Sequence, residues 1–301
     1  MSVDAVLIAG PTASGKSGVA LALAQAIGGT IINTDSMQVY AEARILTARP
    51  AAEDERRAPH LLYGHKSVRD RYSAGQYRED AAAALKAVRA SGRTPIFVGG
   101  TGMYFTVLSD GIAEIPVVPP PTRRRTEELR RTWGAEKFHA ELRKRDPETA
   151  ARLRPSDTQR NLRAFEVYEA TGEPLSFWQK RMGAPVLKDM KVARFVIAPD
   201  RAELHRRIAA RFDRMVAEGG LEEAAALRFL DPSLPAAKIL GLRELAAVHA
   251  GTLTLQEATG RAQAATRQYA KRQTTWFRQR MRDWTWMEMP DAGAIAARVG
   301  A

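Results

Sequence analysis

Residues 10–17 have the side chains and the backbone freedom needed to bind phosphate groups. They read Gly10-Pro11-Thr12-Ala13-Ser14-Gly15-Lys16-Ser17, which matches the pattern G-x-x-x-x-G-K-[ST]. In this pattern the glycines let backbone N–H groups turn around a diphosphate, the lysine adds positive charge, and the last hydroxyl can ligate Mg²⁺. The apolar run 5–9 precedes the motif and a helix-forming segment follows it. The sequence therefore predicts a diphosphate or triphosphate site, without indicating which phosphate compound it holds.

Asp35 follows a second apolar run and could act on a substrate held by this loop. The segment reads Thr34-Asp35-Ser36-Met37-Gln38. A carboxylate at this position could serve as a general base or as a partner of Mg²⁺. It could equally cap a turn, which is a common role of Asp after a strand. The residue types alone leave these roles open.

A glycine-rich turn, Gly99-Gly100-Thr101-Gly102, follows a third apolar run. Its glycines would let the backbone approach a ligand, and the Thr101 hydroxyl could bond an oxygen of a leaving diphosphate or simply cap the next helix. Nucleotide hydrolases with this type of loop usually place an Asp at the end of a middle strand to hold Mg²⁺, and here Gly99 stands there instead. A small-molecule or nucleotide kinase remains an alternative, because arginines in the middle of the chain could form the closing lid that such an enzyme needs.

Alternating strands and helices must position these groups. We predict buried parallel strands at residues 5–9, 30–33, 95–98 and 194–198, separated by helices that include residues 17–27 and 74–89. This pattern is typical of an α/β fold in which helices flank a parallel sheet, similar to that of P-loop NTPases. Ligands of such sheets bind at the carboxyl ends of the strands, so the residues after each strand should meet there.

A change of composition divides the chain. After a proline cluster at residues 116–121 the sequence becomes charged and helix-forming. We predict a helical insertion at residues 113–191, within a P-loop α/β core made of residues 1–112 and 192–301. From residue 201 onward the pattern predicts helices to the end of the chain.

The charge of the chain points to a polyanionic partner. Its 46 Lys and Arg against 34 Asp and Glu give a net charge of +12, although a basic surface without a partner is the alternative. Residues 261–282 hold seven Lys or Arg and no acid, and four of these bases share one helix face: Arg267, Lys271, Arg278 and Arg282. We interpret three aromatic residues of this stretch as core side chains rather than base-stacking platforms: Tyr269, Trp276 and Phe277.

Other features exclude several classes of protein. The chain has no cysteine, so it has neither disulfides nor thiolate metal sites nor a cysteine nucleophile. Its five histidines lack metal-ligand spacing, and we interpret them as structural. The first residues lack a basic n-region, and the apolar run after them is too short for a signal peptide or a membrane span. We therefore expect a cytoplasmic protein, and a monomer by default.

Four ordered blocks give the chain a close resemblance to the tRNA dimethylallyltransferase family. They are residues 10–17, Asp35-Ser36-Met37-Gln38-Val39-Tyr40, residues 98–104, and Lys271-Arg272-Gln273-Thr274-Thr275-Trp276-Phe277-Arg278. The resemblance spans nearly the full length. It implies that the loop holds the diphosphate of dimethylallyl diphosphate, with Mg²⁺, rather than ATP. The acceptor that it implies is N6 of the adenosine just 3′ of a tRNA anticodon, and the second product is diphosphate.

The resemblance also assigns residues. It implies that Asp35 is the general base, that Thr101 contacts the substrate at the reaction centre, and that Lys16 and Ser17 contact the diphosphate and Mg²⁺. We add Arg211 to the diphosphate site, since it is expected on a helix after the last strand. The positions implied to contact tRNA are Asp35, Ser36, Met37, Gln38, Thr101, Arg123, Gln159, Arg160, Asn161, Leu162, Arg163, Lys238, Arg243, Lys271, Arg272 and Arg278. A non-catalytic RNA-binding protein that retains the loop is a further alternative.

Overall fold

The structure, a computed structural model, describes residues 3–300 and consists of two compact units. The first unit contains residues up to 109 and from 186 onward, and the second contains residues 110–185. The insertion predicted at residues 113–191 overlaps the second unit, whose bounds lie a few residues earlier. None of the helices in the described part of the chain combines the length and apolar content needed to cross a bilayer.

A parallel sheet of six strands forms the centre of the first unit, in the order β3-β2-β4-β1-β5-β6. The strands are β1 (Ala5–Ala9), β2 (Gly29–Asn33), β3 (His60–Leu61), β4 (Thr94–Gly99), β5 (Val192–Ile197) and β6 (Thr285–Met287). The predicted α/β fold with a parallel sheet is confirmed. The prediction that the chain is helical from residue 201 to its end was wrong, because β6 pairs with β5 at the edge of the sheet. A strand of three residues has too few positions to show a period of two.

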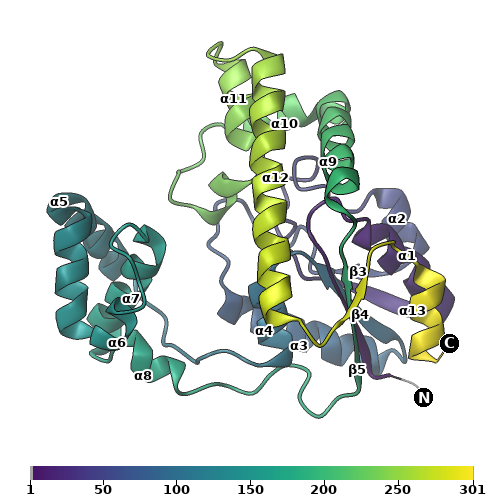
Figure 1. The fold of residues 1–301 in the computed structure, drawn as a ribbon, viewed down its shortest axis with the longest axis horizontal. Coiled ribbons are helices and arrows are strands. Elements are labelled where there is room, and N and C mark those ends of the chain that lie inside the picture. The colour runs from purple at the N-terminus through teal and green to yellow at the C-terminus, as the bar shows by residue number, and fades with distance from the viewer. Residues whose placement is uncertain (1–2, 301) are drawn as a thin grey trace. The chain divides into compact units, whose positions relative to one another are not determined.

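Helices cover both faces of this sheet (Figure 1). Those of the first unit are α1 (Lys16–Ile27), α2 (Ala52–Arg57), α3 (Ala74–Ala90), α4 (Gly102–Ser109), α9 (Arg201–Met215), α10 (Leu221–Ala226), α11 (Leu242–His249), α12 (Leu255–Arg280) and α13 (Ala292–Val299). A π-helical turn, Val216–Gly220, joins α9 to α10, and a short 3₁₀ helix, Pro235–Lys238, precedes α11. Both α1 and α13 pack on one face, where alternate residues of β1, Val6 and Ile8, enter the same apolar cluster as Ile295.

The long helix α12 explains how the C-terminal sequence reaches the phosphate loop. It packs against α9, α11 and α4, and Figure 1 shows it running alongside α9 with its C-terminal end near α4. Its buried positions recur every three or four residues: Ala258, Ala262, Thr266, Ala270, Gln273 and Phe277. This spacing keeps one stripe of the helix inside the unit and exposes its basic residues on the other side.

The second unit consists of helices. It contains α5 (Pro120–Arg145), α6 (Pro147–Ala150), α7 (Thr158–Thr171) and α8 (Leu175–Gln179). Helix α5 is interrupted at Gly134, which has a φ of 76°. Packing of α5 on α7 buries Phe138 against Phe165, whose ring centroids lie 4.6 Å apart. The unit therefore has an apolar core of its own.

Candidate active site

Residues 10–17 form a turn between β1 and α1, and several of its backbone N–H groups have no acceptor among the described residues. Ala13 and Gly15 have φ angles of 63° and 89°, and backbone that alternates in this way turns successive N–H groups to one side. The N–H groups of Ala13, Gly15, Lys16 and Ser17 donate to no acceptor within residues 3–300. Unpaired donors at a helix N-terminus form a binding site for an anion.

Three charged groups converge beside this turn. Burial lowers the pKa of Lys16 from 10.5 to about 8; the negative charge of Asp35 opposes this shift and the positive charge of Arg211 adds to it. Burial also lowers the pKa of the Arg211 guanidinium, again against the charge of Asp35. Lys16 Nζ donates to Pro11 O at 3.2 Å, and Arg211 makes no hydrogen bond or ion pair with residues 3–300. Lys16 is buried and Arg211 is half-buried, and neither cation has an anionic partner at hydrogen-bond distance within residues 3–300, which favours the binding of a polyanion.

The segment after β2 fixes Asp35 at the same edge of the sheet. The Asn33 side chain accepts from the N–H of Asp35 at 2.8 Å and donates to its carbonyl at 2.9 Å. Asp35 Oδ1 accepts from the N–H of Met37 at 3.0 Å, which is the turn-capping role that the sequence left open. Its other oxygen, Oδ2, accepts no hydrogen bond from residues 3–300. One oxygen thus orients the carboxylate while the other remains available as a base.

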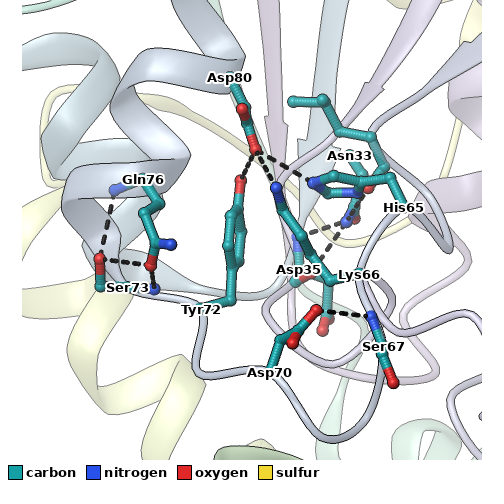
Figure 2. A network of polar contacts seen from close by, with 11 residues as sticks. Asn33, Asp35, His65, Lys66, Ser67, Asp70, Tyr72, Ser73, Gln76 and Asp80 are labelled. Carbon is teal, nitrogen blue, oxygen red and sulfur yellow. Dashed lines mark hydrogen bonds and ion pairs between the residues drawn. The ribbon is translucent and has the colours of Figure 1, made fainter. Parts of the chain in front are cut away.

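A network of polar contacts around Asp80 supports this region from the side of α3 (Figure 2). Asp80 Oδ2 accepts from the Tyr72 hydroxyl at 2.8 Å and lies 3.3 Å from Lys66 Nζ and 3.2 Å from His65 Nε2. Burial acts to raise the pKa of Asp80, but these hydrogen bonds outweigh it and the pKa is lowered. The carboxylate therefore keeps its charge and holds residues 65–72 against α3. His65 thus has a structural role in this network. No group of three or more His, Asp or Glu side chains that could hold a metal ion occurs among the described residues.

Thr101 reaches the segment of Asp35 directly. Its Oγ1 accepts from the N–H of Ser36 at 2.9 Å and donates to Ser36 Oγ at 3.2 Å. The Thr101 carbonyl also accepts from the N–H of Tyr104 in the first turn of α4. The hydroxyl is thus bonded to Ser36 rather than to the N-terminus of α4, and its contact with a substrate stays a prediction. The structure thus joins Asp35, Thr101 and the phosphate loop at one edge, as the strand-end rule predicts.

Two side chains of α12 explain why glycines are needed after β4. These two side chains were not identified from the sequence as part of the site. A Cβ on Gly100 would collide with the amide of Gln273, and a Cβ on Gly102 would collide with the indole of Trp276. The buried Gln273 amide accepts from Thr12 N–H at 2.9 Å and donates to Gly100 O at 2.8 Å. The signal that could have identified Gln273 is its place on the buried stripe of an otherwise small or apolar face. The absence of a Cβ at Gly100 and Gly102 therefore makes room for side chains of α12, and not only for a ligand.

Arg207 also supports the loop and was not predicted. It lies one turn before Arg211 on α9, donates from Nη1 to Ser14 O at 3.1 Å, and pairs through Nε with Glu203. Arg207 therefore fixes the loop backbone, while Arg211 faces the charges of Asp35 and Lys16. Their separation of four residues places both on the same face of the helix.

The positions implied to contact RNA have different environments. Lys271, Arg272 and Arg278 are exposed on α12, where Lys271 and Arg272 line a surface groove of about 460 Å³. Lys238 and Arg243 are also exposed, before and within α11. Gln38 donates to the carbonyls of Thr47 and Ala48 at 3.0 and 2.8 Å, while Met37 and Ser36 are half-buried.

In the second unit only part of the predicted RNA-contacting stretch is accessible. Gln159 and Arg160 are exposed and Arg123, Leu162 and Arg163 are half-buried. Asn161 is fully buried, donates to the carbonyls of Arg154 and Asp157, and lies 2.8 Å from His139 Nδ1. A buried amide with these partners stabilises the start of α7 rather than presenting a surface.

Comparison with known proteins gives consistent matches over the chain. The family model described as IPP transferase matches residues 38–280. A tRNA dimethylallyltransferase of Rhodopseudomonas palustris is 50% identical over 293 residues, which cover 97% of this chain and 91% of that protein. The solved structure of a tRNA isopentenylpyrophosphate transferase from Bacillus halodurans has a TM-score of 0.67 and 30% identity, covering 98% of this chain and 96% of that one. A eukaryotic dimethylallyltransferase, solved acting on tRNA, has a TM-score of 0.74 and 26% identity over 92% of this chain and 70% of that one.

Proposed function

Because the chain belongs to the IPP transferase family, we propose that it transfers the dimethylallyl group of dimethylallyl diphosphate to a tRNA. The acceptor is N6 of the adenosine just 3′ of the anticodon, and the products are N6-isopentenyladenosine and diphosphate. The observation that carries the proposal is the convergence of Lys16, Arg211 and Asp35 beside four unpaired N–H groups of the phosphate loop. This arrangement provides cations for a diphosphate and a carboxylate for an amine.

The reaction exchanges a carbon–oxygen bond for a carbon–nitrogen bond and moves one proton from N6 to Asp35. The N6 nitrogen attacks the allylic carbon, the bond from this carbon to the diphosphate oxygen breaks, and the leaving diphosphate takes the electron pair. Negative charge develops on the leaving oxygens, where Lys16, Arg211 and the loop N–H groups stabilise it. An aromatic amine is a weak nucleophile, so acceptance of its proton by Asp35 Oδ2 assists the attack. Thr101 positions the Asp35 segment through Ser36.

A magnesium ion fits the residues of the loop. The Ser17 hydroxyl is exposed and has no hydrogen-bond partner within residues 3–300, and it lies in the position of the motif that ligates Mg²⁺. Mg²⁺ usually takes few protein ligands and completes its shell with phosphate oxygens and water. When bound, it would neutralise charge on the leaving diphosphate.

The basic residues suit the RNA substrate. Adenosine in an anticodon loop must leave its stack to reach the loop-bound donor, which costs a few kcal/mol. Contacts of phosphates with Lys271, Arg272 and Arg278 on α12 would offset this cost. In the first unit, Lys238 and Arg243 are further proposed RNA contacts. In the second unit, the proposed contacts are Arg123 and the exposed residues of the 159–163 stretch. We also propose that the enzyme acts as a monomer in the cytoplasm. A chain without cysteines forms no disulfide, so its folding needs no oxidising compartment.

The proposal is tested by incubating the protein with Mg²⁺, tRNA and dimethylallyl diphosphate labelled in the allyl group. The expected result is label in the RNA and N6-isopentenyladenosine after nuclease digestion. The matched control is the same tRNA with guanosine in place of the acceptor adenosine, which should remain unlabelled. Label that stays out of RNA while ATP is consumed would instead indicate a kinase. Binding of tRNA without any turnover would indicate a non-catalytic RNA-binding protein.

A further inference from the structure

The N–H groups of the phosphate loop are not all available to a ligand. Gln273 Oε1 occupies the N–H of Thr12 at 2.9 Å, and Pro11 O occupies that of Ser14 at 3.2 Å. The groups without a partner lie toward the helix, at Ala13, Gly15, Lys16 and Ser17. The end of the loop that is farther from α1 is therefore closed by a side chain of α12.

The orientation of the Gln273 amide is fixed by its two partners. Thr12 N–H can only donate, so it requires the amide oxygen, and Gly100 O can only accept, so it requires the amide nitrogen. Gln273 is only 6% exposed, and both partners are backbone groups of loops that follow buried strands. This geometry directs a carbonyl oxygen, which carries partial negative charge, at the loop.

From these contacts we infer that Gln273 is a specificity-determining residue that limits the phosphate loop to two phosphates. We place the first two phosphates of such a chain on the free donors of residues 13–17, so that a third phosphate would lie toward Thr12. At that place it meets no donor, because the Thr12 N–H is taken, and it meets the Gln273 oxygen, which repels its negative charge. A diphosphate ends before this point and is bound by the remaining donors and by Lys16.

This inference rests on the proposed function, since it assumes that the loop holds the diphosphate of the donor. It assigns the rejection of triphosphates to a residue outside the loop motif. The loop sequence by itself is equally suited to ATP, so selectivity must come from groups that surround it. Gln273 is the side chain of α12 that contacts the loop backbone by a hydrogen bond.

The test compares inorganic pyrophosphate with inorganic tripolyphosphate as ligands, by calorimetry at a constant concentration of free Mg²⁺. The intact protein should bind pyrophosphate at least about tenfold more tightly, as expected when one charge-assisted hydrogen bond is missing for the third phosphate. In Gln273→Ala the Thr12 N–H becomes free, and the preference should fall by about tenfold. Gln256→Ala is the matched control, because Gln256 is exposed near the start of the same helix. The ratio of its affinities for pyrophosphate and tripolyphosphate should equal that of the intact protein.

Each outcome bears on one proposal. The inference is overturned if a folded Gln273→Ala protein has the same ratio of affinities for pyrophosphate and tripolyphosphate as the intact protein. It is also overturned if the intact protein binds tripolyphosphate as tightly as pyrophosphate or more tightly, which can be measured without any variant. An equal loss of affinity for both ligands in Gln273→Ala also overturns it, since Gln273 would then only support the loop. In all these cases transfer of label to tRNA by the intact protein would leave the proposed function standing. If the intact protein neither binds pyrophosphate nor transfers label, the proposed function itself fails.

Discussion

Thr101 Oγ1 accepts a hydrogen bond from the N–H of Ser36 at 2.9 Å, which ties the turn after β4 to the segment after β2. Asp35 precedes Ser36 in that segment, so the position of the carboxylate depends on a hydroxyl from another strand end. In the proposed reaction this hydrogen bond matters, because the general base must lie within hydrogen-bond reach of the proton it accepts.

We expect Thr101→Ala to lower kcat of tRNA prenylation by about tenfold or more while changing KM for tRNA by less. Thr101→Ser keeps the hydroxyl and should retain most of the activity. The measurement is steady-state kinetics of label transfer with both variants. Equal activity of Thr101→Ala and the unchanged enzyme would show that the Thr101–Ser36 bond does not position Asp35.

The affinity of the loop for diphosphate should depend on pH through Lys16. Burial lowers the pKa of Lys16 to about 8, so its charge is lost as the pH rises through this value. A bound anion favours the charged lysine, so binding above about pH 8 should take up a proton and become weaker with rising pH. Calorimetry of pyrophosphate binding between about pH 7 and 9 in buffers of different ionisation enthalpy measures both effects.

Lys16→Gln serves as the control for this experiment, because pyrophosphate itself titrates in the same way whichever protein is present. It should bind pyrophosphate weakly and without the proton uptake assigned to Lys16. If both proteins show the same dependence on pH, the lysine does not titrate in this range.

Two glycines should respond oppositely to the same substitution. Gly102→Ala places a Cβ against the rigid indole of Trp276 and should destabilise the fold by about 1–3 kcal/mol. Gly260→Ala, in an exposed turn of α12 with open space around the new Cβ, should stabilise it by about 0.5–1 kcal/mol. Denaturant unfolding of the two variants measures these changes. A Gly102→Ala protein as stable as the parent would contradict the close packing of α12 on α4.

The exposed bases of α12 should act on RNA through phosphates. Neutralising Lys271 and Arg278 should weaken tRNA binding and reduce the salt slope by about one for each phosphate that the variant no longer neutralises. Lys86→Gln, on the exposed side of α3, is a control that should leave the slope unchanged. Binding assays over a range of salt concentrations provide the slopes, and an unaltered slope in the α12 variants would remove these residues from the RNA-binding surface.

Local patterns in the sequence predicted the central part of the fold and one edge of the site. The motif at residues 10–17 lies between a strand and a helix, and Asp35 and Thr101 follow neighbouring parallel strands, as expected. The edge strands β3 and β6 were not predicted, because strands of two and three residues depend on pairing with distant segments rather than on their own pattern.

Local patterns in the sequence could not predict that α12 contributes side chains to the site. Gln273 lies 261 residues from Thr12, and a glutamine in a helix usually indicates an exposed position. Only the register of the helix, which places Gln273 in line with Ala270 and Phe277, indicates burial. The same applies to Asn161, which belongs to the implied RNA-contacting stretch and yet is buried. Residue type alone does not predict an interaction that tertiary packing creates.

The central claim is that Asp35 removes the proton of an amine that attacks a loop-bound allylic donor. The most direct measurement is single-turnover transfer of labelled dimethylallyl to tRNA by Asp35→Asn, with binding of tRNA and pyrophosphate measured on the same protein. The account predicts that transfer slows by about 10²–10⁴-fold, the usual contribution of a general base, while both affinities stay within a few-fold. Transfer at an unchanged rate would contradict the account and remove Asp35 from the reaction.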